Sequence, residues 1–212
     1  MVIIGTGGFA LESYEVLLEQ NFKGEIIFYN DIDPLFKFNI PQLKNSQIIR
    51  SYNELKEYFK VNDTKYILGV GNPKVRELLF KKFNKIGGTA FNLISPMSKI
   101  GNLQNVLGTG VNIMTGTIVT SDITISNGVL INLNCTIGHG CKIGKFSEIC
   151  PSVNISGNCH IGDNVFIGTG ATIIPNIKIG SRAIIAAGSV VIKDVEENTM
   201  VAGNPATFKK LI

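Results

Sequence analysis

Aliphatic residues recur at every sixth position along the second half of the chain. From Leu107 to Val191, fifteen consecutive positions spaced by six are Leu, Ile or Val, with no slip in register. The position four residues after each is small or β-branched, and glycine commonly follows the aliphatic residue. An α-helix cannot use a strict period of six, because its apolar positions would rotate around its surface. Short strands joined by tight turns can use it.

This repeat predicts a prism of parallel strands with the aliphatic side chains inside. Three strand-and-turn sides close one triangular coil of 18 residues, so fifteen hexapeptides give five coils. Glycine and asparagine supply the backbone freedom that the turns need. We therefore expect a parallel β-helix of about five coils over residues 94–195, followed by a C-terminal tail, residues 196–212.

The first part of the chain has a different pattern, that of alternating strands and helices. Residues 2–4 and 25–29 are predicted strands, and between them lies an amphipathic helix with four apolar residues on one face: Leu11, Tyr14, Leu17 and Leu18. Ser51 with Glu54 forms a capping box that opens a short helix. A strand at residues 66–71 precedes Asn72-Pro73, which caps a helix ending near Phe83. Residues 1–93 are thus expected to form a compact α/β domain of Rossmann type with about three parallel strands.

Composition supports the division into two domains. Of the 17 Phe and Tyr residues, 14 lie before residue 100, whereas 15 of the 23 glycines lie after it. A hydrophobic content of 44% argues against disorder. The net charge of +4 is spread over both halves, so nucleic-acid binding has little electrostatic support.

Targeting signals and metal motifs are absent from the sequence. No apolar run has the length of a membrane span, and the N-terminus lacks the basic and apolar regions of a signal peptide. The four cysteines have no C-x-x-C spacing, so we expect no metal site and reduced cysteines in a cytoplasmic protein.

The glycine-rich segment after the first strand predicts a phosphate site. Gly5, Gly7 and Gly8 let the backbone approach a ligand, and the helix that follows offers unpaired N–H groups. Asn30-Asp31, at the end of the second strand, can take a ribose hydroxyl or a base N–H. The motif is not the full dinucleotide fingerprint, and the domain is short for an NAD enzyme. A tight strand-to-helix turn without a ligand is the alternative.

The order of the two domains resembles a known family. A small Gly-loop α/β domain ahead of a hexapeptide β-helix is similar to the bacterial sugar acyltransferases of the sialic acid O-acetyltransferase type, which include N-acetyltransferases of nucleotide-linked 4-amino-4,6-dideoxy sugars. Five segments carry the resemblance over nearly the whole chain: residues 5–8, 30–31, 69–72 with Arg76, 137–139 and 203–206.

The resemblance implies a left-handed β-helix, a homotrimer and two substrates. The nucleotide sugar would lie on the first domain, at Gly5, Gly7, Gly8, Phe9, Asn30, Asp31, Gly71 and Asn72. Acetyl-CoA would lie along the β-helix between neighbouring subunits. Gly157, Thr169 and Ala187 fall at positions where its pantetheine arm passes, and we expect them on one ridge of the prism. Each is alternatively a routine turn residue.

His139 matches the family's catalytic histidine. A neutral imidazole can take the proton that an attacking amine or hydroxyl must lose. A surface histidine without a role is the alternative. Relatives often have an acid directly after this histidine, where this chain has Gly140, and Glu148 occurs nine residues after His139. We hypothesise that Glu148 reaches across the trimer interface and partly replaces the missing acid; an ordinary exposed glutamate is the alternative.

These observations predict an acetyl-CoA-dependent N-acetyltransferase of a nucleotide-linked 4-amino-4,6-dideoxy sugar for surface polysaccharide or glycan biosynthesis. His139 would act as the general base in a direct transfer. The alternatives are an O-acetyltransferase that acts on a sugar such as sialic acid, and a non-catalytic trimer that binds nucleotide sugars.

Overall fold

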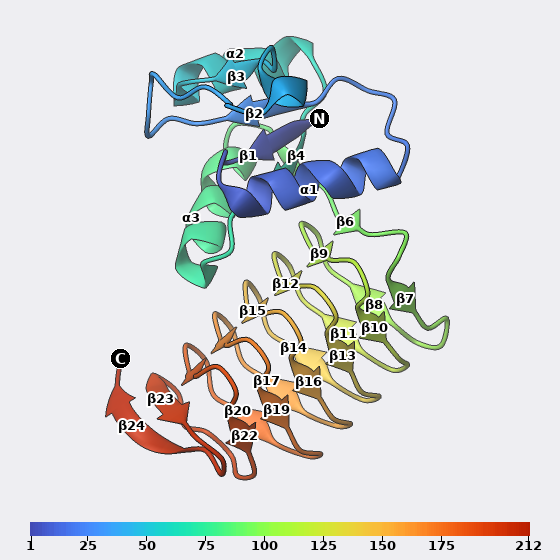
Figure 1. Cartoon of the computed structure of the whole chain (residues 1–212), viewed down its shortest axis with the longest axis vertical. Coiled ribbons are helices and arrows are strands. Elements are labelled where there is room, and N and C mark those ends of the chain that lie inside the picture. The colour runs from blue at the N-terminus through green and yellow to red at the C-terminus, as the bar shows by residue number, and fades with distance from the viewer.

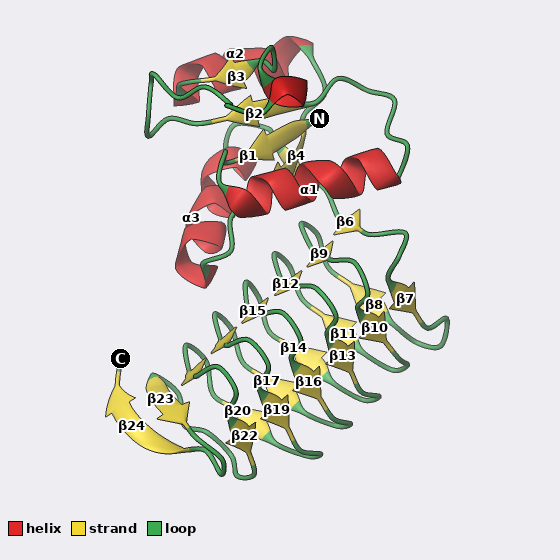
Figure 2. Ribbon diagram, in the orientation of Figure 1, coloured by secondary structure: helices red, strands yellow, loops and turns green.

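The computed structural model describes residues 1–212 and places two domains one above the other along the long axis of the molecule (Figure 1). All of the helices belong to the N-terminal domain, and the rest of the chain is strands and turns (Figure 2). None of the helices is both long enough and apolar enough to cross a membrane.

The N-terminal domain is built on a sheet of five parallel strands in the order β3-β2-β1-β4-β5. The predicted strands are β1 (Val2–Ile4), β2 (Ile27–Tyr29) and β4 (Lys65–Leu68). The sequence missed β3 (Ile48–Ile49) and β5 (Thr89–Ala90), because two residues show no alternation. The helices are α1 (Gly8–Glu19), α2 (Tyr52–Val61) and α3 (Pro73–Asn84), with a 3-10 turn at Pro41–Leu43.

The helix starts follow the predicted caps. The Ser51 hydroxyl accepts a hydrogen bond from the Glu54 N–H, and the Asn72 side-chain oxygen accepts one from the Val75 N–H, each at 3.2 Å. The predicted face of α1 is wrong in one position, because Leu18 is 47% exposed. The buried residues of α1 are Ala10, Ser13, Val16 and Leu17. The helix therefore packs through Val16 and Leu17 together with the small residues Ala10 and Ser13, of which only Leu17 was predicted on the packed face.

The β-helix has three faces, each a stack of short parallel strands. We call the first the cleft face: β6 (Leu93–Ile94), β9 (Asn112–Ile113), β12 (Leu130–Ile131), β15 (Glu148–Ile149), β18 (Phe166–Ile167), β21 (Ile184–Ile185) and β23 (Thr199–Ala202), with β24 (Thr207–Leu211) added antiparallel. The neutral face holds β7 (Lys99–Ile100), β10 (Ile118–Val119), β13 (Thr136–Ile137), β16 (Asn154–Ile155), β19 (Thr172–Ile173) and β22 (Val190–Val191). The basic face holds β8 (Val106–Leu107), β11 (Thr124–Ile125), β14 (Lys142–Ile143), β17 (His160–Ile161) and β20 (Lys178–Ile179).

Five coils are complete, from β6 to β20, and β21 and β22 begin a sixth. The first coil lies before Leu107, where the sequence repeat seemed to begin. Ile94 and Ile100 keep the spacing of six, but Leu107 follows Ile100 by seven residues. One extra residue in the intervening turn therefore hides the first coil from a strict period of six.

The inward aliphatic side chains form a single core of 28 buried residues along the prism. All four cysteines are buried and free. Lys142 pairs in register with His160, so Cys141 and Cys159 occupy equivalent positions in adjacent coils, as the 18-residue spacing predicts.

The N-terminal domain packs directly on the cleft face. Met114 and Leu130 of the prism belong to the same buried cluster as Ile3 and Leu17 of the first domain. Along α3, the Phe80 ring meets the Phe146 ring edge to face at 5.3 Å. The cluster and the aromatic pair give the two domains a shared apolar interface.

Candidate active site

A cavity of about 760 Å³ opens at the carboxyl ends of β1, β2 and β4. Parallel sheets of this kind bind ligands at that edge, where the strand order reverses. Residues from three loops line the cavity, which we call the cleft, and they include all eight predicted contacts for the nucleotide sugar: Gly5, Gly7, Gly8, Phe9, Asn30, Asp31, Gly71 and Asn72. Residues far apart in the sequence are thus brought together at one site.

The three glycines of the first loop differ in what they do. Gly5 has a φ of +112°, and a Cβ there would lie 2.9 Å from the Gly69 carbonyl oxygen, so the fold itself requires a glycine. A Cβ on Gly7 or Gly8 would meet no atom within 4 Å. Gly7 is the N-cap of α1 and provides no capping side chain. The N–H groups of the first turn therefore have no acceptor within the chain, as an anion site requires.

Asn30 shapes the cleft through hydrogen bonds within the chain. One amide N–H of its side chain donates to the Thr6 hydroxyl at 2.9 Å, and its oxygen accepts from the N–H groups of Ile32 and Asp33. These contacts order the loop from Asn30 to Asp33 and leave the second N–H of the Asn30 amide without a partner in the chain. The predicted contact between Asn30 and the nucleotide sugar stays a prediction.

Asp31 is held by two donors that the sequence did not indicate. The Tyr29 hydroxyl donates to its Oδ2 at 2.7 Å, and the Lys82 ammonium donates to the same atom at 2.9 Å. Burial raises the pKa of Asp31, but the two hydrogen bonds and the charge of Lys82 outweigh it and keep that pKa below 3.8. The Asp31 carboxylate is therefore ionised, and its second oxygen has no donor within the chain.

Glu148 lies under the far end of the cleft, against Gly71. A Cβ on Gly71 would lie 2.6 Å from the Glu148 Oε1, so a side chain there would displace the Glu148 carboxylate from its present position. In register on either side of Glu148 are Leu130 and Phe166, both apolar. Burial raises the pKa of the Glu148 carboxyl, and the attraction of Arg76 opposes that shift.

Arg76 joins the two domains at the base of the cleft. It is fully buried on α3, and its guanidinium makes five hydrogen bonds. Two go to carbonyls at the end of β4, those of Leu68 and Val70, and three go to the prism: the Gly110 and Gly128 carbonyls and the Asn112 side chain. Burial lowers the pKa of Arg76 to about 9, against the attraction of Glu148, so it is charged at neutral pH.

His139 lies on the far side of the prism from Glu148. It follows β13 of the neutral face and precedes β14 of the basic face, and so marks the corner opposite the cleft face. Its exposed imidazole lies over Gly157 of the next coil, where a Cβ would come within 2.7 Å of the Nε2. Within one chain, the two predicted catalytic side chains do not meet.

The three predicted acetyl-CoA residues do not share one ridge, and that expectation is wrong. Thr169 and Ala187 are stacked on the corner between the cleft and neutral faces, and the Gly188 N–H donates to the Thr169 carbonyl at 2.8 Å. Gly157 lies on the corner of His139. The reason is the spacing: Thr169 follows Gly157 by 12 residues, which is two thirds of a coil.

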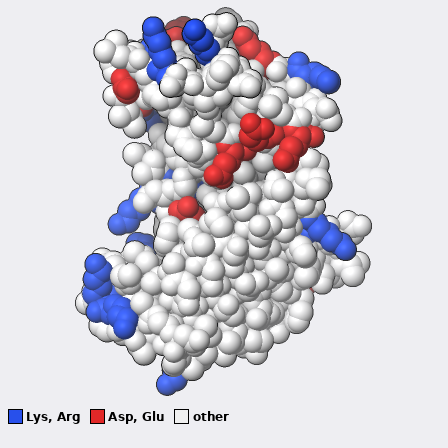
Figure 3. All heavy atoms as spheres, viewed as in Figure 1, with Lys and Arg blue, Asp and Glu red and all other residues white.

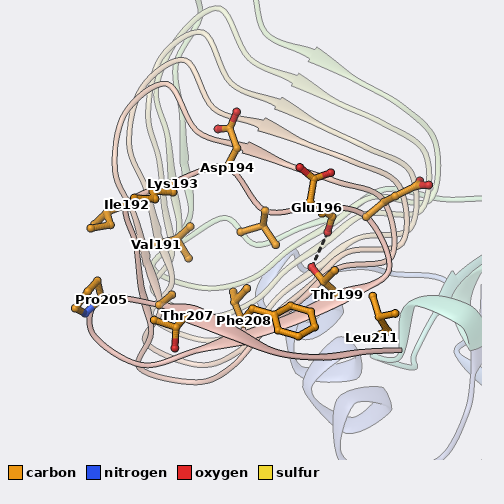
Figure 4. Close-up of a pocket in the computed structure, with 14 residues that line it drawn as sticks. Val191, Ile192, Lys193, Asp194, Glu196, Thr199, Pro205, Thr207, Phe208 and Leu211 are labelled. Atoms are coloured by element: carbon orange, nitrogen blue, oxygen red, sulfur yellow. Dashed lines mark hydrogen bonds between the residues drawn. The ribbon is translucent and has the colours of Figure 1, made fainter.

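A second cavity, of about 680 Å³, lies at the C-terminal end of the prism between β22 and the β23–β24 hairpin (Figure 4). No predicted site residue lines it. Asp194, Glu196 and Glu197 are among its lining residues, and they would repel the phosphates of both expected substrates.

On the face of the molecule shown in Figure 3, surface charge indicates no further site. In the view of Figure 3, acidic side chains gather near the middle of the molecule, while Lys and Arg are scattered and the prism shows few charges. The structure contains no group of three or more His, Cys, Asp or Glu side chains that could hold a metal ion.

Comparisons with known proteins agree with this arrangement. Residues 1–83 match the PglD N-terminal domain, and residues 158–193 match the bacterial transferase hexapeptide (six repeats). A mutant of perosamine N-acetyltransferase from Caulobacter crescentus, solved with CoA and GDP-perosamine, is 26% identical with a TM-score of 0.90, over 99% of this chain and 96% of that one.

Two further solved structures are similar over both full lengths. The acetyltransferase domain of PglB from Neisseria gonorrhoeae, in complex with acetyl coenzyme A, is 26% identical with a TM-score of 0.87, and 98% of each chain is covered. WeeI from Acinetobacter baumannii is 28% identical with the same TM-score and coverage. The chain is therefore a hexapeptide-repeat acetyltransferase with a PglD-type N-terminal domain and a left-handed β-helix, as its sequence predicts.

The structure predicts that Arg76 determines the stability of the domain interface. Its removal leaves buried carbonyl oxygens without donors, each at a cost of about 1–3 kcal/mol. Arg76→Met should lower the free energy of unfolding by about 3 kcal/mol or more in urea titrations. Arg182→Met is the matched control, because the Arg182–Glu197 ion pair is 48% and 62% exposed and contributes at most about 1 kcal/mol. Equal losses in the two variants would contradict this role.

Asp31 makes stability depend on pH in the acid range. Its pKa is lower in the folded protein than the ordinary 3.8, so its contribution is present above that value and is lost as the pH falls through the folded pKa. Asp31→Asn should therefore be less stable than the wild type at pH 7 and equally stable at strongly acid pH. Lys82→Met, which removes one of the two donors, should show a smaller loss with the same sign. A difference that does not change with pH would contradict this assignment.

Proposed function

We propose that the protein transfers an acetyl group from acetyl-CoA to the amine of a nucleotide-linked 4-amino-4,6-dideoxy sugar. The observation that carries this proposal is the cleft, in which every predicted nucleotide-sugar contact gathers beside a domain interface. A solved structure of similar fold and domain order binds CoA and GDP-perosamine. The product would serve surface polysaccharide or glycan biosynthesis in the cytoplasm.

The cleft offers a separate position for each part of a nucleotide sugar. The pyrophosphate fits the first turn of α1, at Gly7, Gly8 and Phe9, because its N–H groups are free and the helix dipole favours an anion. The free oxygen of Asp31 accepts from a base N–H or a ribose hydroxyl. The sugar then extends past Asn72 and Gly71 towards Glu148.

We further propose a homotrimer in which each active site belongs to two copies. His139 and Glu148 lie on opposite sides of one prism, so one chain cannot bring both to one substrate. From β10 to β22, the outward residues of the neutral face carry no charge: Ile118, Thr136, Asn154, Thr172 and Val190. Packing of this face around a threefold axis would bring the His139 corner of one copy to the cleft face of the next.

The same assembly accounts for the two corners that carry the predicted acetyl-CoA contacts. Gly157 of one copy and Thr169 with Ala187 of its neighbour would flank one pantetheine arm. Gly157 lies directly beside the His139 imidazole, so the thioester and the base would be close.

In the proposed reaction, the nitrogen of the sugar amine bonds to the acetyl carbonyl carbon, and His139 takes a proton from that nitrogen. The carbon–sulfur bond breaks, and CoA leaves as a thiolate that takes up a proton. Glu148 of the neighbouring copy stands in for the acid that many relatives have directly after the histidine, where this chain has Gly140.

Mass spectrometry of mixtures with acetyl-CoA and UDP-, GDP- or dTDP-linked amino sugars tests the function. Wild-type protein should add one acetyl group to a 4-amino sugar, and His139→Ala should lower kcat by about 100-fold or more. Acetylation of hydroxyl sugars alone would favour the O-acetyltransferase, and no transfer with intact nucleotide-sugar binding would favour the binding protein. Glu148→Gln should lower kcat, with Glu25→Gln, at an exposed glutamate just before β2 and away from both the cleft and the His139 corner, as the control. Wild-type kcat in Glu148→Gln would contradict its role.

A further inference from the structure

The Glu148 carboxylate lies against the cleft residue Gly71, outside the lining of the cavity itself, and it accepts no hydrogen bond within the chain, whereas Asp33 in the lining accepts one from the Leu35 N–H. Asp31 is paired with Tyr29 and Lys82, whereas no side chain or backbone group donates a hydrogen bond to Glu148. Partial burial of a carboxylate without a hydrogen-bond donor costs free energy. The apolar neighbours on both sides of Glu148 exclude water that would otherwise donate to it. A stable fold does not need such a group at this position.

Arg76 cannot be the missing partner, although its charge attracts Glu148. A guanidinium has five N–H donors, and the five hydrogen bonds of Arg76 go to four carbonyls and to the Asn112 side chain. No ion pair joins Arg76 to Glu148 within 4.0 Å. Arg76 therefore favours the ionised form of Glu148 without occupying either of its oxygens.

Gly71 is the cleft residue against which this carboxylate lies. Gly71 lines the cleft, and a Cβ there would collide with the Glu148 Oε1. The backbone conformation of Gly71 does not demand a glycine, because its φ is not positive. The missing side chain is thus required only for the contact between the loop and the carboxylate.

We propose that Glu148 is the counter-ion of the protonated amine of the acceptor sugar and that this pairing selects amino sugars over their hydroxyl counterparts. A sugar amine carries a proton and a positive charge at neutral pH, and a hydroxyl does not. The bound ammonium releases this proton to solvent before the neutral amine nitrogen attacks the thioester, and His139 takes the second proton during the attack. The acetyl group of the product is attached through a neutral amide, which cannot form this ion pair. The product should therefore bind more weakly than the substrate. This proposal rests on the proposed function, because it assigns the acceptor to the same cleft.

The test is binding without acetyl-CoA, measured by calorimetry on the full chain. The ligands are UDP-, GDP- and dTDP-linked 4-amino-4,6-dideoxy sugars, GDP-perosamine among them, each with a counterpart that has a hydroxyl at C4. Within the pair of ligands that the wild-type protein prefers, it should bind the amino-sugar nucleotide at least about 10-fold more tightly than the hydroxyl counterpart, as a charge-assisted hydrogen bond allows. Glu148→Gln should remove this preference, because it should lower the affinity for the amino-sugar nucleotide and leave the affinity for the hydroxyl counterpart unchanged.

Two further variants separate this role from a structural one. Gly71→Ala keeps the charge of Glu148 but displaces the carboxylate, and should reduce the same preference. Glu25→Gln, at an exposed glutamate just before β2 and at the opposite edge of the sheet from the cleft, should leave it unchanged.

An unchanged ratio of amine to hydroxyl affinity in Glu148→Gln would overturn the proposal, even if kcat falls, because a carboxylate that only orients His139 does not affect this ratio. If the wild type binds no amino-sugar nucleotide at all, the proposed function fails, and this inference fails with it.

Discussion

The five hydrogen bonds of Arg76 are the interaction on which the geometry of this protein depends. A fully buried guanidinium is costly, and here its charge is compensated by carbonyl oxygens from both domains rather than by a carboxylate. Two of those carbonyls end the strand that leads into the cleft, and two others belong to turns of the prism. The cleft in which we propose that the nucleotide sugar binds is therefore fixed relative to the β-helix.

This arrangement leaves an acid free for chemistry. Because Arg76 uses all of its donors on carbonyl and amide oxygens, Glu148 receives its electrostatic support but no hydrogen bond. This unpaired carboxylate lies between apolar neighbours and against Gly71, at the end of the cleft where the sugar is proposed to bind. The domain interface and the proposed specificity thus have one physical origin.

The sequence predicted most of the fold, because strict periodicity is a strong signal. The hexapeptide repeat identified the β-helix, and only the extra residue between Ile100 and Leu107 hid its first coil. Eight of the 19 residues that line the cleft were predicted from the loop motifs and the family resemblance. Sequence could not show that Asn30 bonds within the chain or that Tyr29 and Lys82 hold Asp31, because those contacts depend on tertiary packing.

Arg76 was identified only as part of a motif, and a charged residue on a helix is ordinarily exposed. Its burial beside three glycine-containing turns had no signal in the sequence.

The central claim is that a cleft on one copy acts with the His139 corner of another. Hybrid oligomers of His139→Ala and Gly7→Asp, co-expressed with two different tags, test it most directly. Aspartate is a favoured N-cap residue and a Cβ at Gly7 meets nothing within 4 Å, so Gly7→Asp keeps the fold while its carboxylate repels the pyrophosphate. Each variant alone should be inactive, and the hybrids should regain acetyl transfer, because an intact cleft from one chain meets an intact His139 from the other. Hybrids that assemble but remain as inactive as their parents would contradict the account.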